Sequence, residues 1–575
     1  MMRRQGRLLA AFTVTAALIA APGARADGFV KEPTATGTGG AAATVDALAT
    51  RAAINTLRRG GNAIDATVAA AGVLGVTEPF SCGIGGGGFM VIRTRGGKVT
   101  TIDGRETAPA AMRPDTYFEN GTPLSFTDAR WSGLSAGVPG TVATWDKALR
   151  RYGTFSLRQA LRPGIRVAHR GFEVDQTFFN QTDAAKDWFD DVPSTAAIYL
   201  DSDGTPRDVG TILRNPDMAR AYRYIGRHGA DGFYRGPIAD AMERAAQHPP
   251  VASTANHAWR PGLLTARDVS RYRARWRKPT HVGYRGLDVW SMGPPSSGGS
   301  TVGEALNILE GYSPLGTDRV QALHRFIEAS RYAFADRNAY VADPAYFDVP
   351  LGGLLSDSFA AERRSLITDT AANAVVAPGD PYDHEGKSTT HLSVTDAKGN
   401  VVSYTFTIES TGGNGIVVPG WGFLLNNELT DFNYDSTTHP NRAEGGKRPR
   451  SSIAPTIVTR DGRPVLAVGS PGGATIITTV LQLLIDHFDL HSSLPDAIAA
   501  PRVSQRNAVA SAAEPAFIAS PEAQQLITRH GHKPFTDAGE IGAATGIDFL
   551  GDGRLLAAAE PVRRGGGSAA VVTPR

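Results

Sequence analysis

The sequence lacks several features that define whole classes of protein. It contains a single cysteine, Cys82, among 575 residues, which excludes an intrachain disulfide and any zinc or iron–sulfur site built from cysteines. The net charge is only +3, from 59 Lys and Arg against 56 Asp and Glu, so it gives no reason to expect a nucleic-acid or polyanion partner. Beyond the N-terminal segment, no apolar run reaches the roughly 18 residues of a membrane-spanning helix.

Glycine, in contrast, is abundant. The 65 glycines follow no collagen-like period, so they indicate many tight turns and close approaches of the backbone. Hydrophobic residues make up 41% and charged residues 20% of the chain, a balance that permits a large core and excludes wholesale disorder. We therefore expect a large globular protein that is held together by its core alone.

The N-terminus has the pattern of a secretory signal. Arg3, Arg4 and Arg7 precede an apolar run over 8–21, and Ala24-Arg25-Ala26 suits a signal-peptidase cleavage site. The run is too short to span a membrane comfortably. We therefore predict a signal peptide over 1–26 and a secreted protein, extracellular or periplasmic, whose export route stays open.

The periodicity of the remaining chain changes once. Helices are predicted over 41–75 and over most of 140–345, with a strand hairpin over 89–102 between them. The segment 366–388 is rich in Asp, Ala, Gly and Pro without periodicity, and it is typical of an exposed connector. From Thr389 onward the pattern predicts mainly strands.

Two segments that alternate polar and apolar residues, 389–395 and 401–409, flank a five-residue turn that contains a glycine. Their pairing places Thr389 opposite Thr407, with Cβ atoms about 5 Å apart. One face of the second strand is polar throughout: Ser403, Thr405, Thr407 and Glu409. By itself, this pattern favours a solvated face.

A second hairpin is predicted over 451–473, around an Asp-Gly turn. Its register places Ser451 opposite Gly472. The next segment, 474–488, has helical spacing, so Gly472 and Gly473 should lie at a helix N-terminus, with backbone N–H groups available to an anion. Alone, the pair of glycines is equally typical of a tight strand-to-helix turn.

Taken together, these motifs and others of the N-terminal half resemble the gamma-glutamyltranspeptidases. The matching stretches, in the order of that family, are Asp103-Gly104-Arg105-Glu106, Pro294-Pro295-Ser296-Ser297-Gly298-Gly299, Thr389-Thr390-His391, Asn426-Asn427-Glu428, Arg450-Ser451-Ser452 and Ser470-Pro471-Gly472-Gly473. The resemblance runs from about residue 35 to the C-terminus. It implies an N-terminal nucleophile hydrolase with a four-layer αββα sandwich and a mainly helical N-terminal portion.

The resemblance also implies a precursor that cuts itself. Cleavage between Ser388 and Thr389 would give a large subunit, 27–388, and a small subunit, 389–575, which form a heterodimer. A threonine hydroxyl is a poor nucleophile at neutral pH, and the freed α-amino group, with an ordinary pKa of about 7.7–8.0, can serve as its general base. His391 then has no required part in catalysis.

The family pattern assigns roles to the other residues of the predicted site. Thr407 would orient the hydroxyl of Thr389, and the amides of Gly472 and Gly473 would form an oxyanion hole. The substrate α-carboxylate would be held by Arg105, Ser451 and Ser452, and the α-ammonium by Glu428 and Asp431. No cofactor and no metal is implied.

Two departures from the family pattern affect the expected substrate. Glu409 stands where many members have Asn, and the extra carboxylate could add to ammonium binding or alter the substrate range. Only 433–450 separates the acidic pair from Ser451-Ser452, whereas members with a lid have a longer insertion there. We therefore predict a short or absent lid and an open pocket.

The implied activity is hydrolysis or transfer of γ-glutamyl groups, from glutathione and related amides to water or an amino-acid or peptide acceptor, through a γ-glutamyl-threonine ester. An acylase of the same family, acting on glutaryl, cephalosporin-type or polyglutamyl amides, is the first alternative. An unprocessed, non-catalytic exported protein is the second.

Three further motifs are weaker. Gly133–Gly137 fits G-x-S-x-G, but no buried strand precedes it. Gly83–Gly88 fits G-x-G-x-x-G, but a helix precedes it and a strand follows, the reverse of a dinucleotide site, so a close-packed loop is expected. Asp383-His384-Glu385 has no second histidine nearby and is typical of a solvated loop rather than a metal site.

Overall fold

The computed structural model describes residues 30–312, 314–377 and 389–574. The predicted signal peptide and Ser388 lie outside these residues. One large sheet dominates the molecule. Its strands, in the order in which they lie side by side, are β8 (Arg275–Arg277), β3 (Val99–Gly104), β2 (Gly87–Arg93), β12 (Val401–Thr407), β11 (Thr390–Asp396), β1 (Thr34–Thr44), β19 (Leu555–Ala559), β18 (Thr545–Phe549), β14 (Arg463–Gly469), β13 (Thr456–Arg460), β10 (Leu287–Ser291) and β9 (Thr280–Tyr284), with β20 (Ser568–Pro574) also paired to β1.

This sheet folds over on itself to form two facing layers. Strands β11 and β12 contact β14 and β18, although they are not their hydrogen-bonded neighbours. Between the layers, Val91 and Val401 pack against Ile457 and Ala467, and the Ser403 hydroxyl donates to the Val468 carbonyl at 3.2 Å.

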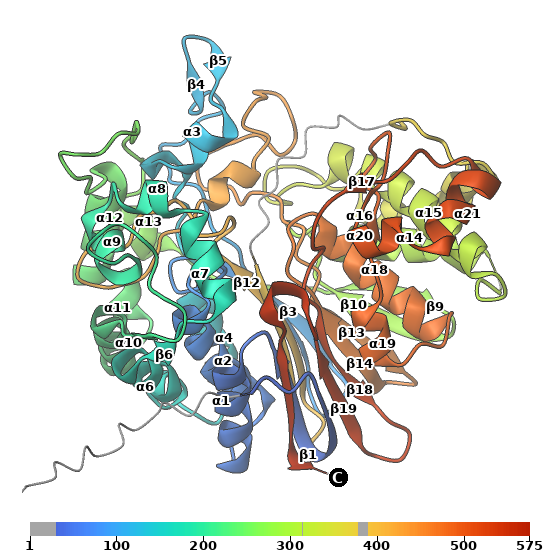
Figure 1. The fold of residues 1–575 in the computed structure, drawn as a ribbon, viewed down its shortest axis with the longest axis horizontal. Helices are drawn as coiled ribbons and strands as arrows, with labels where there is room; N and C mark the ends of the chain where they lie inside the picture. The colour runs from blue at the N-terminus through green and yellow to red at the C-terminus, as the bar shows by residue number, and fades with distance from the viewer. Residues whose placement is uncertain (1–29, 313, 378–388, 575) are drawn as a thin grey trace, which may run out of the picture.

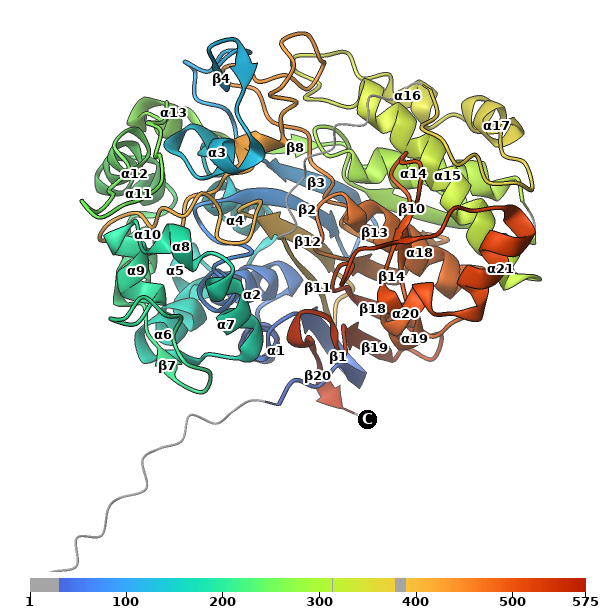
Figure 2. The ribbon, with the colours of Figure 1, turned by 45° about the horizontal axis from the view of Figure 1, so that its top comes forward.

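Helices cover both outer faces (Figures 1 and 2). On one side lie α1 (Ala47–Arg58), α2 (Ala63–Thr77), α4 (Thr141–Tyr152), α6 (Arg162–Arg170), α10 (Pro216–His228) and α12 (Pro237–Gln247). On the other lie α14 (Gly298–Glu310), α15 (Arg319–Tyr340), α17 (Asp357–Ser365), α18 (Thr475–Phe488), α19 (Leu494–Ala499) and α21 (Pro521–His530). Helix α2 packs on β11 and β12, and α18 packs on β14. The predicted four-layer αββα arrangement is therefore confirmed.

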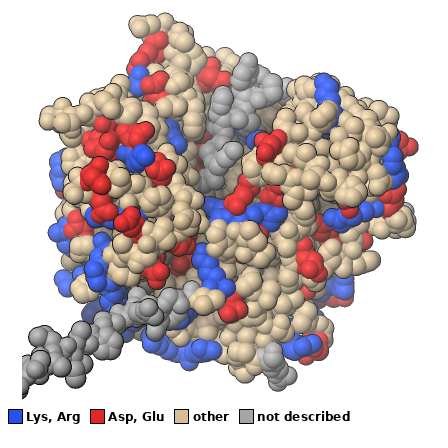
Figure 3. Space-filling view, viewed as in Figure 1, with Lys and Arg blue, Asp and Glu red and all other residues tan. Residues whose placement is uncertain are grey.

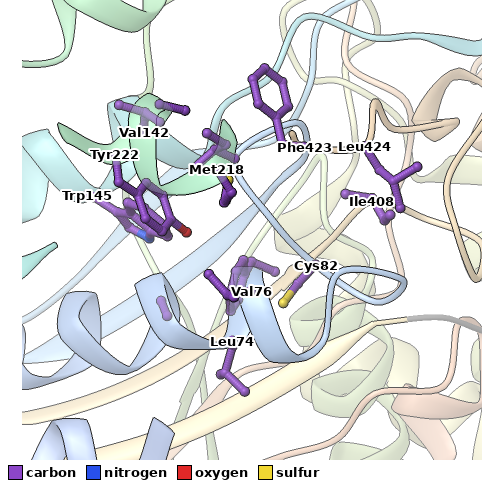
Figure 4. Packing of buried hydrophobic residues seen from close by; sticks show 14 of the residues in the cluster. Leu74, Val76, Cys82, Val142, Trp145, Met218, Tyr222, Ile408, Phe423 and Leu424 are labelled. Atoms are coloured by element: carbon purple, nitrogen blue, oxygen red, sulfur yellow. The ribbon is translucent and has the colours of Figure 1, made fainter. Parts of the chain in front are cut away.

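The largest core lies between the sheet and the first helical layer. Helix α2 is buried on all sides, which explains why its sequence is apolar around its whole circumference. Leu74 and Val76 of this helix lie near Cys82, while Trp145 and Tyr222 pack nearby from α4 and α10 (Figure 4). No helix in the described part of the chain combines the length and the apolar character that crossing a bilayer requires.

Two parts of the chain predicted as helix are strands. Residues 41–44 belong to β1, because Ala41–Ala43 are fully buried between β11 and β20, where strand pairing outweighs the helix preference of alanine. Within 140–345, β9 and β10 form an edge hairpin of the sheet. In β9, buried and exposed residues alternate, a period-two signal that the sequence interpretation missed.

The register of the first hairpin is confirmed, since Thr390 pairs with Phe406 and Thr395 with Val401. The register of the second is confirmed only near its turn, where Arg460 pairs with Arg463. Between Thr459 and Val458 the pairing shifts by one residue, so that Val458 pairs with Leu466. A β-bulge absorbs an extra residue there, so the predicted pairing of Ser451 with Gly472 is wrong.

Candidate active site

Nine of the ten residues predicted from the sequence line one cavity: Arg105, Thr389, Thr407, Glu409, Glu428, Asp431, Ser451, Ser452 and Gly473. Gly472 precedes the last of these. The free volume of this cavity is about 20 Å³, which is room for one water molecule. Figure 3 shows one face of the molecule, which is hollowed between the two helical layers and carries charged side chains of both signs beside the hollow.

Thr389 lies at the start of β11, where its hydroxyl faces the end of β12. The Oγ1 atoms of Thr389 and Thr407 are 3.4 Å apart in a hydrogen bond, and Thr407 Oγ1 also accepts from the backbone N–H of Glu409 at 2.8 Å. The Thr389 carbonyl accepts from Nη1 of Arg564 at 2.8 Å, and Nη2 of Arg564 donates to Ser81. The hydroxyl and the carbonyl of Thr389 are therefore both held by hydrogen bonds. The contact with Arg564 was not predicted from the sequence.

The glycine-rich loop before β2 supports the end of β12. A Cβ atom on Gly86 would come within 1.9 Å of the Thr407 carbonyl oxygen, and one on Gly85 within 1.9 Å of the Leu424 carbonyl oxygen. Only glycine allows these approaches. The expectation of a close-packed structural loop at Gly83–Gly88 is confirmed.

Gly472 and Gly473 form the turn between β14 and α18. Both have positive φ angles, +136° and +58°, which glycine adopts without strain. Their carbonyls accept from the N–H groups of Thr475 and Ile476 and so begin the helix. As expected, the amides of both glycines belong to the N-terminal end of a helix, where the helix dipole favours negative charge.

A buried charge cluster forms one wall of the cavity. Arg105 follows β3 and is fully buried, and Glu428 and Asp431 lie on the 3₁₀ turn η2 (Glu428–Asp431). Arg105 makes ion pairs with both carboxylates and donates to the carbonyls of Pro449 and Arg450. The residues predicted to bind opposite ends of a zwitterion therefore bind each other.

Glu106 adds a third carboxylate behind Arg105. It is fully buried, its nearer oxygen is 3.9 Å from Nη1 of Arg105, and neither carboxylate oxygen has a hydrogen-bond partner in the described structure. Burial raises the pKa of Glu106 to about 8, although Arg105 opposes the shift. Burial likewise raises the pKa of Glu428. Three carboxylates surround one guanidinium, so we expect one of them to keep a proton. We expect Glu106 to carry it, because Glu428 and Asp431 contact Arg105 directly and Glu106 makes no hydrogen bond within the described chain.

Glu409 is held by uncharged donors. Its backbone has a positive φ of 78°, and its Oε2 accepts from the Ser410 hydroxyl at 2.5 Å and from the Asn427 side-chain amide. The partly buried guanidinium of Arg130 is close enough to interact electrostatically with this carboxylate. Asn427 belongs to the Asn426-Asn427-Glu428 motif, but nothing in the spacing of that motif indicated this contact.

Ser451 and Ser452 lie against α14 and α15. The Ser451 carbonyl accepts from both the N–H and the hydroxyl of Ser297, each at 2.7 Å. The Ser452 hydroxyl accepts from Nη2 of Arg337 at 2.6 Å. Arg337 lies 115 residues from Ser452 in the chain, so only the tertiary structure reveals their contact.

The polar face of β12 is buried rather than solvated, contrary to what the strand pattern alone favours. Ser403, Thr405 and Thr407 are at most 2% exposed, because this face lies between the two sheet layers. His391 belongs to the same interior: its imidazole bonds to Thr405 and Ser393 and packs on Gly469, and burial lowers its pKa to about 3. It is therefore neutral at pH 7.

The alternative motifs do not form sites. Ser135 is fully buried and donates to the carbonyls of Arg130 and Ser132, so no exposed nucleophile follows a strand there. Asp383-His384-Glu385 lies outside the described residues. Among the described residues, no group of His, Cys, Asp and Glu is arranged to hold a metal ion. The connection 433–450 is held near the cavity by Asn441, whose side chain donates to the Asp431 carbonyl and accepts from the Arg450 N–H. The open pocket stays a prediction.

Comparison with known proteins matches residues 49–570 to the family Gamma-glutamyltranspeptidase. The chain is 37% identical over 508 residues to a glutathione hydrolase proenzyme of Pseudomonas sp. (strain A14), with 86% of each protein covered. It is 37% identical over 543 residues to the acylase ACY 1 proenzyme of Pseudomonas sp. (strain V22), covering 92% of this chain and 93% of that protein.

Solved structures agree. Cephalosporin acylase from Bacillus halodurans superposes with a TM-score of 0.81 at 29% identity, covering 94% of this chain and 97% of that chain. The Helicobacter pylori gamma-glutamyltranspeptidase chain gives 0.53 at 31% identity, covering 58% of this chain and 92% of that chain. The layered fold and these neighbours define an N-terminal nucleophile hydrolase. Within that class, the chain belongs to the gamma-glutamyltranspeptidase family, and its relatives support a hydrolase of this family.

Proposed function

We propose that this protein is a self-processing γ-glutamyl hydrolase and transferase that acts on glutathione and related γ-glutamyl amides. The observation that supports this function is the convergence on one cavity of a threonine hydroxyl, Gly473 at a helix N-terminus and a compact cluster of Arg, Glu and Asp. Each of these groups has a function in acyl transfer from a substrate that carries a free α-ammonium and a free α-carboxylate. Thr389 is the proposed nucleophile.

Cleavage before Thr389 would both release its α-amino group and activate the enzyme. An amide nitrogen cannot accept a proton, whereas a free amine can act as general base. The amine then takes the proton of the Thr389 hydroxyl as its oxygen attacks the γ-carbonyl carbon. Thr407 orients that hydroxyl, and the amides of Gly472 and Gly473 stabilise the negative charge on the carbonyl oxygen.

The tetrahedral intermediate collapses to a γ-glutamyl ester of Thr389 as the proton passes to the departing amine. Water or the amino group of an acceptor attacks the ester carbonyl, and its proton returns through the α-amino group. Hydrolysis yields glutamate, and transfer yields a new γ-glutamyl amide. Both outcomes regenerate the hydroxyl and the free amine of Thr389.

A zwitterionic head fits the charge cluster because it can replace the internal ion pairs. The substrate ammonium would bind Glu428 and Asp431, with Glu409 adding a further carboxylate. The substrate carboxylate would then take up donors of Arg105, Ser451 and Ser452. The exchange leaves each buried charge paired, which avoids the cost of an isolated charge in the interior.

The test of this function is the variant Thr389→Ala. The wild-type protein is expected to resolve on a denaturing gel into two pieces, one of which has Thr389 at its N-terminus by mass spectrometry. The variant should remain one full-length band and hydrolyse γ-glutamyl anilide at no more than the uncatalysed rate. A wild-type protein that stays uncut and inert would favour a non-catalytic exported protein instead.

An acylase activity on glutaryl, cephalosporin-type or polyglutamyl amides is the second candidate. It is favoured by the acylases among the relatives and by the short connection 433–450. Glutaryl amides lack the α-ammonium group, so a comparison of γ-glutamyl and glutaryl anilides separates the two functions. A Glu428→Ala or Asp431→Ala variant that kept full γ-glutamyl turnover would contradict the proposed ammonium site.

We further propose that residues 1–26 direct export and are removed. The mature protein would then be a secreted heterodimer of 27–388 and 389–575. The N-terminal positive charges and the apolar run support this proposal. N-terminal sequencing of the secreted protein tests both cleavage positions at once.

A further inference from the structure

Helices α1 and α6 form the two walls of a groove that shares no lining residue with the candidate active site. Both helices lie beside α2 (Figures 1 and 2) and pack on it, and Val73 of α2 lies at the floor between them. The groove has a volume of about 260 Å³. Its lining includes Arg51, Arg166 and Arg170 and no acidic residue, so we call it the arginine groove.

The walls of this groove carry positive charge from both helices. Arg162, Arg166 and Arg170 follow one another at intervals of four residues, so they lie along one face of α6. Helix α1 contributes Arg51, and Arg59 directly follows its last residue. Neither helix contains Asp or Glu. The small net charge of the whole chain therefore conceals a local excess of positive charge.

The arginines around the groove repel one another. Arg59 and the three arginines of α6 make no ion pair within the described part of the chain. The pKa of Arg166 is lowered, because its guanidinium is partly removed from water and because the neighbouring charges are all positive, those of Arg59, Arg170 and Arg162. A bound anion would relieve this repulsion, so the groove is complementary to negative charge.

The other lining residues narrow the class of anion. A guanidinium matches a phosphate group through two parallel N–H donors. Beside the arginines, Leu48 and Val167 are only partly buried, and they give the groove an apolar surface. A free inorganic anion has no use for such a surface, whereas a phosphate attached to a hydrocarbon chain can cover it. The lining therefore favours an amphipathic phosphate ligand.

The N-terminal end of the described chain borders the same face. Val30 lines an adjoining cavity of about 480 Å³, and Arg51 and Asn55 line both this cavity and the arginine groove. The Val30 side chain is 77% exposed. Under the export proposed above, the signal peptide that precedes this end directs the chain to a membrane. The groove therefore lies on the face through which the chain first meets lipid.

We propose that the arginine groove binds the headgroups of anionic phospholipids and thereby attaches the protein to a membrane surface. The lipid phosphate would lie between Arg166 and Arg170 of α6 and Arg51 of α1. The glycerol and the first carbons of the acyl chains would lie along Leu48 and Val167. The proposal does not rest on the γ-glutamyl function, since none of these residues lines the candidate active site.

Co-sedimentation with vesicles tests this proposal. The purified protein is mixed with vesicles of phosphatidylcholine alone, or of phosphatidylcholine with the anionic lipid phosphatidylglycerol. We expect binding to the anionic vesicles only, and release at high salt, because salt screens the attraction between arginine and phosphate. In the double variant Arg166→Gln/Arg170→Gln the affinity should fall roughly thirtyfold, since each arginine near an anionic surface contributes about fivefold.

The double variant Arg267→Gln/Arg271→Gln is the matched control. Both arginines are exposed and lie four residues apart on α13 (Ala266–Arg271), so this variant loses the same charge from a different helix. It should bind anionic vesicles within about threefold of wild type. Both double variants should keep wild-type turnover of γ-glutamyl anilide. The groove variant should also melt no lower than wild type, because it loses repulsion between like charges.

Three results would overturn the inference. Equal losses of affinity in the two double variants would show that only net charge matters. Equal binding of the wild type to vesicles with and without phosphatidylglycerol would exclude a site for the anionic headgroup. Inorganic phosphate provides the last comparison: if it stabilises the wild type but not the groove variant, and neither protein binds anionic vesicles, the groove is a site for soluble anions rather than for lipid.

Discussion

At the scale of single residues, the site combines groups that would be unfavourable alone. Glu106, Glu428 and Arg105 are removed from water, and their burial is tolerated because opposite charges meet and a proton is retained. Thr389 is an ordinary hydroxyl whose reactivity depends on its surroundings. The chemistry therefore belongs to the arrangement of these side chains rather than to any one of them.

The retained proton makes stability depend on pH. The pKa of Glu106 is raised from 4.5 to about 8, so the folded state binds a proton that the unfolded state releases. The corresponding stability is present below about pH 4.5 and is lost as pH rises through 8, by about 1.4 kcal/mol for each pKa unit. Glu106→Gln should remove this loss, so that the variant melts at a higher temperature than wild type at pH 9.

Thermal melts of both proteins between pH 5 and 9 measure this effect. The exposed Glu119→Gln serves as a control and should follow the wild-type curve. A Glu106→Gln variant whose melting temperature falls with pH as steeply as that of wild type would show that Glu106 does not carry the proton.

At the scale of elements, three histidines fasten the segment that follows α17. The buried rings of His324 and His530 bond to the carbonyls of Thr368 and Asp369, and His324 Nδ1 lies 2.9 Å from His532 Nε2. A carbonyl only accepts, so His324 carries its proton on Nε2 and accepts from His532 on Nδ1. The His324 ring must be neutral to accept this bond.

Acid should weaken this attachment. Burial lowers the pKa of His324 to about 4 and that of His532 to about 3, so the folded state resists protons that the unfolded state binds below pH 6.5. This stability is present above pH 6.5 and is lost as pH falls through 4. His532→Phe should therefore lose less stability than wild type between pH 7 and 4.5, by on the order of 1–3 kcal/mol.

Denaturant unfolding at the two pH values tests this prediction, with the exposed His228→Gln as control. The neighbouring charges of Arg325, Arg331 and Asp369 are the same in all three proteins. Equal losses for wild type and His532→Phe would contradict a role for the histidine network.

At the scale of the whole molecule, the strands of the two proposed subunits are interleaved in one sheet. Along the sheet, β2 of the proposed large subunit is followed by β12 and β11 of the small one, then by β1 of the large one. The small subunit then supplies β19, β18, β14 and β13, and the large subunit supplies β10 and β9 at the far edge. Separation would break strand pairing at every one of these junctions.

The two pieces should therefore stay together after cleavage. On native size-exclusion chromatography they should elute as one species, and only denaturant should separate them. Elution of either piece alone under native conditions would contradict the interleaved sheet in the processed protein. The uncut Thr389→Ala variant gives the reference elution volume.

The sequence alone could predict the features whose residues lie close together in the chain, and it could not predict contacts between distant segments. The hairpin around 396–400 is local, and its alternation fixed the register that brings Thr389 to Thr407. The second hairpin was predicted with the wrong register beyond its turn, because the alternation of polar and apolar residues does not reveal where a β-bulge inserts an extra residue. Arg337 and Arg564 escaped notice because their partners are 115 and 175 residues away.

By itself the sequence determined the hairpins, the buried helix, the family and nine of the residues that line the cavity, because each is recorded in local periodicity or in short motifs. The tertiary structure alone decided that a polar strand face is buried between two sheet layers, that Arg105 pairs with both acids, and that Arg337 lies behind Ser452. These are contacts between distant segments, and they exist only once the sheet has folded over on itself.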